Sequence, residues 1–315
     1  MGKTRIFLVC LIISLLVNIV VLSVFYKNSN EIKSAKDFAA DQMRFPLLSK
    51  RILLEFPQDI LLNFLDLRTE LRNQVKPYGE SFGLYFEYLP TGTTIGINEK
   101  VEFHAASLFK IPVVMAYYRF RERTHRQDDP EITIKKDQLD DQFGDLWKKG
   151  EGARIKASDA VRLTITESDN TAAKTLVPFI EPKDFEAVYQ GLDIDLQSDD
   201  QGALISAKNY SSILKSLYFS SVLDKESSEE ILDLLTKTKF PDKLAAGVPS
   251  NVLVAHKIGD FVDSEGNEGF RDCGIVYVPR RPYVLCIFSV GNEQLARERM
   301  QKLSKTIYDY VSSVK

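Results

Sequence analysis

The sequence predicts an α/β fold of the α+β sandwich kind, in which an antiparallel sheet is built from N- and C-terminal segments and flanked by helices. Early in the domain, residues 82–89 and 93–97 have the pattern of two strands joined by the turn Pro90-Thr-Gly92. Strand patterns return in the last third, at residues 252–257, 274–278 and 283–290. Because the stretch between has apolar residues at helical spacing, we expect an all-helical insertion.

Helices are expected before, within and after these strands. An apolar repeat over residues 60–71 predicts the first helix. Residues 107–123 predict the second, in which Pro112 is tolerated because it lies in an early turn. The remaining helices are expected at residues 157–165, 170–177, 207–218, 228–236 and 293–310.

The N-terminal part differs from the rest in composition. After a tail at residues 1–5, residues 6–26 form an almost unbroken apolar run of the length that spans a bilayer. A cleavable signal peptide has small residues at the cut site, whereas Val24-Phe-Tyr26 is bulky. We therefore expect a transmembrane signal anchor at residues 6–26, a stalk at residues 27–44 and a folded domain at residues 45–315. Cations flank the run on both sides and leave its orientation open.

Composition and charge narrow the classes of protein. A chain of 315 residues with 44% apolar residues can bury a real core, and a net charge of -3 argues against a nucleic-acid partner. Cys10, in the apolar run, is expected to be buried in the membrane. Cys273 and Cys286 lie on strand-like runs of unknown register, so a bridge stays open, but the default expectation is two small buried apolar residues. No metal and no cofactor is expected.

The segment Ser107-Leu-Phe-Lys110 places a serine three residues before a lysine at the start of an expected helix. At this spacing both side chains lie on one helix face, so the amine reaches the hydroxyl. A desolvated lysine can lose its proton and activate a serine nucleophile. The alternative is an N-cap serine with a solvated lysine. Two other pairs share the spacing and fit that alternative: Ser212 with Lys215, and Ser312 with Lys315.

Two further clusters follow in the chain. Ser168-Asp-Asn170 lies between two expected helices and supplies a second hydroxyl beside an amide. Lys257-Ile-Gly259 lies near the end of an expected strand, where glycine permits a ligand to approach the backbone. Taken singly, the first cluster is ordinary helix-capping sequence and the second is an edge-strand lysine before a turn. Three such clusters rarely occur together in this order by chance.

In this order the clusters resemble the Ser-x-x-Lys, Ser-Asp-Asn and Lys-Thr-Gly motifs of the penicillin-recognising serine enzymes, specifically the class A β-lactamase-like branch. The surrounding residues are similar too, in Ala105-Ala-Ser-Leu-Phe-Lys110, Ser168-Asp-Asn-Thr-Ala-Ala173 and Val254-Ala-His-Lys257. The resemblance covers roughly residues 82–310 and implies the fold and the acyl-transfer chemistry of that family.

The resemblance also implies a role for each matched position. Ser107 would attack a carbonyl carbon with Lys110 as the base, and Ser168 would relay a proton to the leaving nitrogen. The implied substrate-binding positions are Asn170 for the amide, Lys257 for the carboxylate, Gly259 in the strand, and Asp260, whose backbone N–H would form an oxyanion hole with that of Ser107.

The chain departs from the family pattern where deacylation is concerned. The family's β-lactamases activate the deacylating water with a glutamate between the second and third motifs, and here that stretch looks short. Glu181-Pro182 imitates the expected pair, but we interpret it as the acidic start of a helix. In the third motif, Ile258 replaces the residue that carries a hydroxyl in the family pattern, and Asp260 brings a carboxylate toward the position of an anionic substrate. Four acids lie where the loop should be, with no motif behind them: Asp193, Asp195, Asp199 and Asp200.

These observations favour a membrane-anchored, extracytoplasmic serine hydrolase of the class A β-lactamase type, single-pass in the cell membrane. It would form an acyl-enzyme on Ser107 with a β-lactam or a peptidoglycan-like peptide amide. One alternative is a D,D-peptidase-like or slowly deacylating penicillin-binding protein. The other is a non-catalytic protein that binds the cell wall.

Overall fold

The computed structural model describes residues 15, 16, 18, 19, 23 and 63–313. By its internal contacts the chain divides into residues 1–60 and residues 61–315, and the second unit contains nearly all of the described residues. The expected tail, stalk and domain start at Phe45 lie outside the described residues, as does most of the expected anchor at residues 6–26. Over the described ranges, no helix is both long and apolar enough to span a bilayer.

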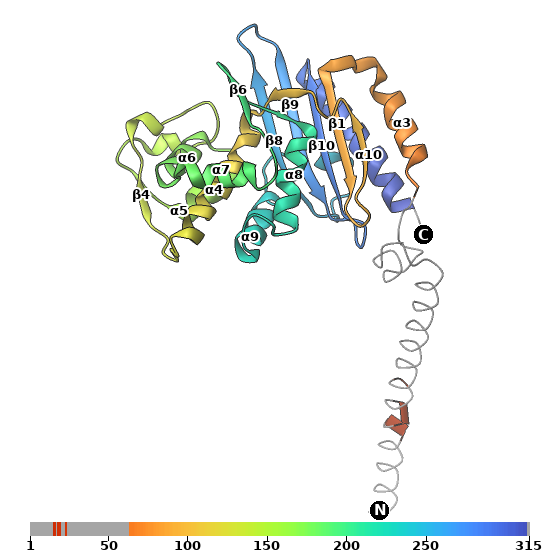
Figure 1. Ribbon diagram of the computed structural model, residues 1–315, viewed down its shortest axis with the longest axis horizontal. Helices are drawn as coiled ribbons and strands as arrows, with labels where there is room; N and C mark the ends of the chain where they lie inside the picture. Colours follow the sequence, from red (N-terminus) through yellow and green to blue (C-terminus); the bar gives the residue numbers. More distant parts are fainter. Residues whose placement is uncertain (1–14, 17, 20–22, 24–62, 314–315) are drawn as a thin grey trace, which may run out of the picture. The chain divides into compact units, whose positions relative to one another are not determined.

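Five antiparallel strands form the central sheet, in the spatial order β2-β1-β10-β9-β8 (Figure 1). Their bounds are β1 Phe82–Tyr88, β2 Thr93–Ile97, β8 Val254–Val262, β9 Glu268–Val276 and β10 Tyr283–Val290. The N-terminal strand β1 pairs directly with the C-terminal strand β10, so that Leu84 lies opposite Ile287. The predicted fold class, with one antiparallel sheet built from both ends of the domain, is confirmed.

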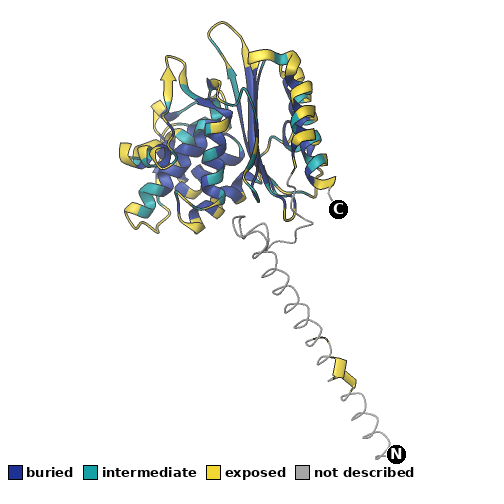
Figure 2. Ribbon diagram, turned by 45° about the vertical axis from the view of Figure 1, so that its right-hand side comes forward, coloured by how far each residue is buried: buried dark blue, intermediate teal, exposed yellow. Residues whose placement is uncertain are grey.

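Both faces of the sheet are buried. Successive side chains of a strand point to opposite sides, and every residue of β1 is buried. Leu84 and Phe86 of β1 belong to one hydrophobic core, together with Leu71 and Ile307, whereas Tyr85 belongs to the other. The helices that cover the first face are α3 (Leu65–Val75) and α10 (Glu293–Ser313). Figure 2 shows dark-blue, buried residues throughout the sheet and in the helices beside it.

Helices dominate the chain between β2 and β8 and cover the other face of the sheet (Figure 1). They are α4 (Lys110–Arg123), α5 (Ala157–Thr166), α6 (Asn170–Leu176), α7 (Pro182–Gln190), α8 (Ala207–Tyr218) and α9 (Lys225–Leu235). Short strands accompany them: β3 Glu102–His104, β4 Glu131–Thr133, β5 Arg154–Lys156, β6 Gln197–Asp199 and β7 Gly202–Ser206. Helix α8 contacts β1, β9 and β10 and thereby joins this part to the sheet.

Short 3₁₀ turns connect several of these elements. They are η1 (Lys76–Ser81), η2 (Ala106–Phe109), η3 (Lys136–Gln138), η4 (Leu146–Lys149), η5 (Val177–Phe179) and η6 (Ala245–Gly247). The helix expected at residues 107–123 therefore begins as the turn η2, and its α-helical part starts only at Lys110. The strand expected at residues 252–257 is longer and ends at Val262, because the whole of β8 pairs with β9.

Cys273 and Cys286 form a disulfide between neighbouring strands. They lie directly opposite each other on β9 and β10, and both are fully buried, as the sequence predicted. The default expectation that they stay unbridged was wrong, because the register that aligns them could not be known from the sequence. Lys257 lies opposite Cys273 on the other side of β9, so the bridge is one strand away from the third motif.

Removing the disulfide is expected to lower the free energy of unfolding. The bridged cysteines are 13 residues apart, and a loop of this size constrains the unfolded chain by about 3 kcal/mol. In urea denaturation, the double variant Cys273→Ala/Cys286→Ala and reduced wild type should unfold at similar midpoints, both below that of the oxidised protein. A midpoint that dithiothreitol leaves unchanged would contradict the bridge.

Candidate active site

Ser107 lies in the turn η2, directly before helix α4. Ala106 before it has a φ of 49°, a left-handed conformation that costs free energy for a residue with a side chain. From the first residue of α4, the Lys110 amine donates a hydrogen bond to Ser107 Oγ over 3.0 Å. The strained turn therefore presents the Ser107 hydroxyl to an amine held on a rigid helix.

The Lys110 amine also joins the first cluster to the second. It donates to Ser168 Oγ over 3.1 Å, to Asn170 Oδ1 over 2.5 Å and to the backbone carbonyl of Ser168. The side chain of Lys110 is buried, so these oxygens replace water around the amine. One buried lysine thus connects α4 with the junction of α5 and α6.

Ser168 is held by the geometry of that junction. Its own φ is 54°, and the following residue, Asp169, caps helix α6 by accepting a hydrogen bond from Ala172 N over 2.8 Å. The second carboxylate oxygen of Asp169 accepts from Leu146 N over 2.8 Å. A Cβ at Gly144 would lie 2.2 Å from this carboxylate, so glycine is required there. The middle residue of the cluster is therefore structural and orients its two neighbours.

The third cluster approaches the other two from the edge of the sheet. Lys257 is fully buried in β8, and its amine donates to Ser168 Oγ over 2.8 Å and to the backbone carbonyl of Ile258 over 3.0 Å. A Cβ at Gly259 would lie 2.9 Å from the backbone oxygen of Ala105. In the structure, the segment that approaches Gly259 closely is the chain's own backbone before Ser107, so this glycine allows β8 to pack against η2.

Burial lowers the pKa of both lysines. Desolvation lowers the pKa of Lys110 to about 8, although the charges of Asp169 and Asp140 oppose the change. The pKa of Lys257 is lowered well below its ordinary value by burial first and by the nearby charge of Lys110 second. A neutral amine can accept a proton, so the site holds a base suited to activating a hydroxyl near neutral pH.

A cavity of about 440 Å³ opens beside Ser107 and Lys110. Other residues that line it include Asn170, Asp260, Val113, Ala173, Val177, Phe143 and Phe261. The cavity therefore places an apolar wall next to the serine and the lysine. Of the seven predicted site residues, Ser107, Lys110, Asn170 and Asp260 line this cavity. Ser168 is hydrogen-bonded to Lys110 and Lys257 to Ser168, while Gly259 packs against the backbone before Ser107.

Asp140 is a site residue that the sequence did not single out. It lines the cavity and accepts hydrogen bonds from Asn170 Nδ2 over 2.9 Å and from the Lys174 amine over 2.8 Å. Burial by itself would raise the pKa of Asp140, but the hydrogen bonds from Lys174 and Asn170 hold this pKa below its ordinary value. Asp141 stands next to it in an acidic loop, and nothing in the sequence distinguishes the two.

Asp260 has a partner that the sequence analysis also missed. The buried amine of Lys243 lies 3.2 Å from Asp260 Oδ2, while Oδ1 has no hydrogen-bond partner in the part of the chain that is described. Burial raises the pKa of Asp260, and the charge of Lys243 opposes this. The carboxylate predicted near the substrate is thus present, but it is already paired on one side.

The other acids and the alternative serine–lysine pair are engaged elsewhere. Glu181 begins α7 in a capping box with Asp184 and pairs with Arg123, as its interpretation as a helix-start acid predicted. Asp199 pairs with His104 over 3.0 Å. Lys215 of the second serine–lysine pair binds Glu87 over 2.7 Å. The four acids of the short loop, Asp193, Asp195, Asp199 and Asp200, are absent from the residues that line the Ser107 cavity.

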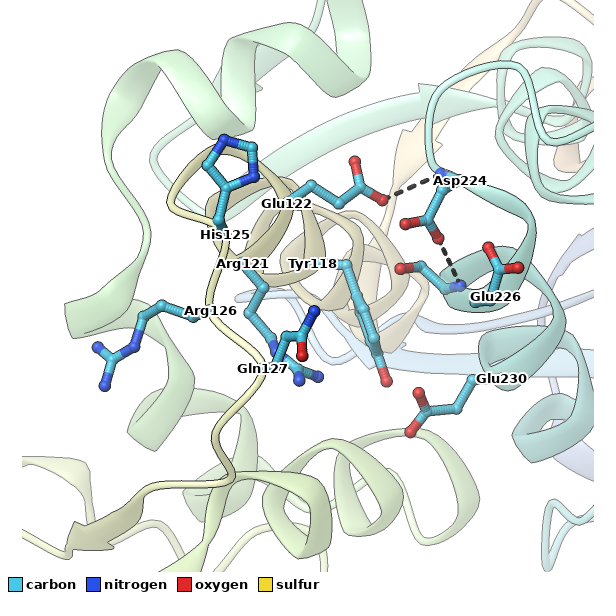
Figure 3. A pocket seen from close by; sticks show the side chains of 10 residues that line it. Tyr118, Arg121, Glu122, His125, Arg126, Gln127, Asp224, Glu226 and Glu230 are labelled. Atoms are coloured by element: carbon cyan, nitrogen blue, oxygen red, sulfur yellow. Dashed lines mark hydrogen bonds between the residues drawn. The ribbon is translucent and has the colours of Figure 1, made fainter.

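A second cavity, of about 430 Å³, lies between the end of α4 and the start of α9 (Figure 3). Arginines and carboxylates line it together, among them Arg121, Arg126 and Glu230. It contains none of the predicted site residues. Groups of three or more His, Cys, Asp or Glu side chains arranged for a metal ion are likewise absent from the described residues.

A serine hydroxyl hydrogen-bonded to a buried lysine on this fold is the arrangement of a serine hydrolase. A family model described as the beta-lactamase enzyme family matches residues 66–311, and the chain belongs to this family. By this family membership it is a serine hydrolase of the β-lactamase type. No curated protein sequence matches the chain.

Solved structures share the fold at low sequence identity. PBP-A is 22% identical with a TM-score of 0.71, over 79% of this chain and 97% of that one. A β-lactamase from Chitinophaga pinensis is 21% identical with a TM-score of 0.71, over 78% and 100% of the two chains. The TLA-3 extended-spectrum β-lactamase is 18% identical with a TM-score of 0.72, over 80% and 100%. At these identities the similarity demonstrates the fold alone.

The reactivity of Ser107 is expected to rise with pH through about 8. The neutral form of Lys110 accepts the proton, and a pKa of about 8 leaves roughly 10% of the amine neutral at pH 7 and most of it neutral at pH 9. Labelling rates with a fluorescent penicillin between pH 6 and pH 10 measure this. In Lys110→Arg, the rate should be low and independent of pH across this range. A wild-type rate that falls as pH rises would exclude Lys110 as the base.

Proposed function

We propose that this hydrolase forms an acyl-enzyme on Ser107 with a β-lactam or a peptidoglycan-like peptide amide and releases the acyl group slowly. The observation that carries the proposal is the position of the Lys110 amine, which lies 3.0 Å from Ser107 Oγ and 3.1 Å from Ser168 Oγ. An amine in that position connects the nucleophile to a second hydroxyl that can pass a proton on.

Acylation then follows from these contacts. Neutral Lys110 takes the proton from Ser107 Oγ while this oxygen forms a bond to the carbonyl carbon of the substrate. When the carbon–nitrogen bond breaks, Ser168 donates its proton to the leaving nitrogen and receives the proton held by Lys110. Lys257 donates to Ser168 Oγ over 2.8 Å and stabilises negative charge on this oxygen during the transfer.

The substrate is held by the remaining residues of the clusters. We place the substrate's amide at Asn170 and its developing oxyanion between the backbone N–H groups of Ser107 and Asp260, since these three residues line the cavity. We place its carboxylate near Lys257, which is hydrogen-bonded to Ser168. Asn170 is fixed for this role because its Oδ1 accepts from Lys110 and its Nδ2 donates to Asp140.

Slow release follows from the acids around the cavity. Among the described residues that line it, the carboxylates are Asp140 and Asp260. Asp140 has a lowered pKa and already accepts from Asn170 and Lys174, which makes it a weak base. Asp260 is paired with Lys243. Because Asp140 is a weak base and Lys243 binds one oxygen of Asp260, we expect neither carboxylate to activate water efficiently, so the acyl-enzyme should persist, as in a slowly deacylating penicillin-binding protein.

A penicillin is a reasonable acylating probe. The structural relatives include a variant of PBP-A that is an acyl-enzyme complex with penicillin G, at 21% identity and a TM-score of 0.71. Its fold supports the choice of this compound for the present chain.

Substituting Ser107 is expected to abolish labelling by a fluorescent penicillin. Ser107→Ala removes the hydroxyl oxygen that is proposed to form the ester, so the labelled band should disappear. The matched control is Ser212→Ala, since Ser212 stands at the same spacing from Lys215 but lies within α8; its labelling should equal that of wild type. Equal labelling of Ser107→Ala and wild type, or no labelling of wild type by any acylating substrate, would reject the proposed nucleophile and favour a non-catalytic wall-binding protein.

Release of the acyl group is tested with nitrocefin on the same preparations. We expect a burst close to one equivalent of hydrolysed nitrocefin per protein molecule, followed by a much slower steady rate. Sustained rapid turnover from wild type would show that another group activates water efficiently, and the protein would then act as a β-lactamase in the full sense.

We further propose that residues 6–26 anchor the domain to the cell membrane and that the domain lies outside the cytoplasm. The length of the apolar run supports the anchor. The disulfide between Cys273 and Cys286 supports the location, because such bonds form and persist in oxidising compartments.

Removing the apolar run is expected to release the protein from membranes. The full chain should sediment with membranes and resist extraction by alkaline carbonate, whereas a chain of residues 29–315 should stay in the supernatant. The Ser107→Ala full chain is the control and should sediment like wild type. Sedimentation of the truncated chain would mean that another part of the protein binds the membrane.

A further inference from the structure

Arg271 on β9 is a buried cation, and two of its guanidinium nitrogens are unpaired within the described part of the chain. It is 3% exposed, and neither Nε nor Nη1 has a hydrogen-bond partner among the described residues. The guanidinium carbon lies over the aromatic ring of Phe261, 5.6 Å from the ring centroid. Burying an unpaired charge costs several kcal/mol, so a guanidinium left in this state calls for an anionic partner.

Arg271 is one of the residues that line a cavity of about 170 Å³, which shares Phe261 with the cavity beside Ser107. Phe261 belongs to the lining of both cavities and so forms the wall between them. On this wall His104 stacks against the ring of Phe261, with centroids 4.2 Å apart and the planes 17° from parallel. A ligand attached to Ser107 and extended past Phe261 would reach Arg271.

The neighbouring strand leaves space for this guanidinium. Gly269 is directly opposite Phe261 in the β8–β9 ladder, and a Cβ at Gly269 would lie 2.3 Å from Arg271 Nη1. Glycine at this position therefore lets the arginine lie flat over the strand. Because Gly269 does not have a left-handed φ, an alanine there would displace the guanidinium without straining the backbone.

The acids near the cavity do not satisfy Arg271. Burial lowers the pKa of Arg271 to about 10, and the charge of Asp260 opposes this change. Asp260 itself is paired with Lys243. At the rim, Asp263 accepts hydrogen bonds from Asn267 within its own hairpin. The two other rim carboxylates, Glu102 and Glu268, are exposed and screened by water.

We propose that this cavity is an anion subsite in which Arg271 binds a carboxylate carried on the acyl side chain of the substrate. The inference rests on the proposed acylation of Ser107 and adds a substrate class to it, namely amides whose acyl part ends in a carboxylate. The unpaired Nε and Nη1 groups of the guanidinium supply the hydrogen bonds. The acyl side chain of the substrate passes along the Phe261 ring from one cavity to the other.

A matched pair of penicillins tests the subsite. Adipoyl-6-aminopenicillanic acid ends its acyl chain in a carboxylate, whereas the hexanoyl derivative ends in a methyl group. We expect wild type to be acylated by the adipoyl compound about tenfold faster at low concentration, the size of a charge-assisted hydrogen bond. In Arg271→Met and in Gly269→Ala, the ratio of the two rates should fall to about one.

The controls separate binding from folding. Arg154→Met removes an exposed arginine on β5, whose side chain is 71% exposed, and should keep the wild-type ratio. Arg271→Met should melt no lower than wild type, because it replaces an unpaired buried charge with an apolar chain. If Arg271→Met lowers the melting temperature and slows both penicillins equally, the arginine is a structural residue and the proposal is wrong. A ratio that is the same in wild type and all variants also overturns it.

A second readout does not depend on acylation. The Nε–H resonance of Arg271, assigned by its loss in Arg271→Met, should shift when sodium acetate replaces sodium chloride at constant ionic strength. If neither penicillin acylates wild type, the proposed function fails, and this titration decides the subsite alone. A shift then supports a site for free carboxylates, and no shift overturns the anion site.

Discussion

The buried amine of Lys110 is the interaction on which the rest of the site depends. It binds oxygen atoms from the turn before α4 and from the junction of α5 and α6, and a second buried amine, that of Lys257, meets it at Ser168. Two lysines can share one hydroxyl in a dry environment only when at least one is neutral, because like charges at this distance repel. The pKa of Lys110 is lowered by its burial, which results from the convergence of these segments around the amine.

The sequence predicted this convergence only in part. The order of the motifs and the strand patterns at both ends of the domain were sufficient to predict the central sheet, because alternating apolar residues determine which faces of a strand are buried. Asp140 and Lys243 were missed, because each owes its position to partners far away in the chain, Asn170 and Asp260. The disulfide needed the register of β9 with β10, and hydrophobic patterning does not specify which residues of two strands stand opposite each other.

The charges around the cavity support the proposal that acylation is faster than release of the acyl group. The two amines of the proposed acylation, those of Lys110 and Lys257, have lowered pKa values. Asp140 has a lowered pKa and binds Lys174, whereas burial raises the pKa of Asp260 although Lys243 binds one of its oxygens. An anion held by a cation is a poor acceptor of a proton from water. Under the proposed function, the ion pairs that keep the polar residues in place would leave the acyl-enzyme without an efficient base.

The edge position of β8 adds a mechanical constraint. An edge strand has a hydrogen-bonded neighbour on one side only, and β8 must still hold Lys257 within hydrogen-bond distance of Ser168. On one side Gly259 lets η2 pack directly against the strand. On the other side β9 carries Cys273 opposite Lys257, and the disulfide joins β9 to β10 in the middle of the sheet. Because a group that acts on a substrate must be held within a fraction of an ångström, we expect the disulfide to help keep Lys257 in place for its proposed role.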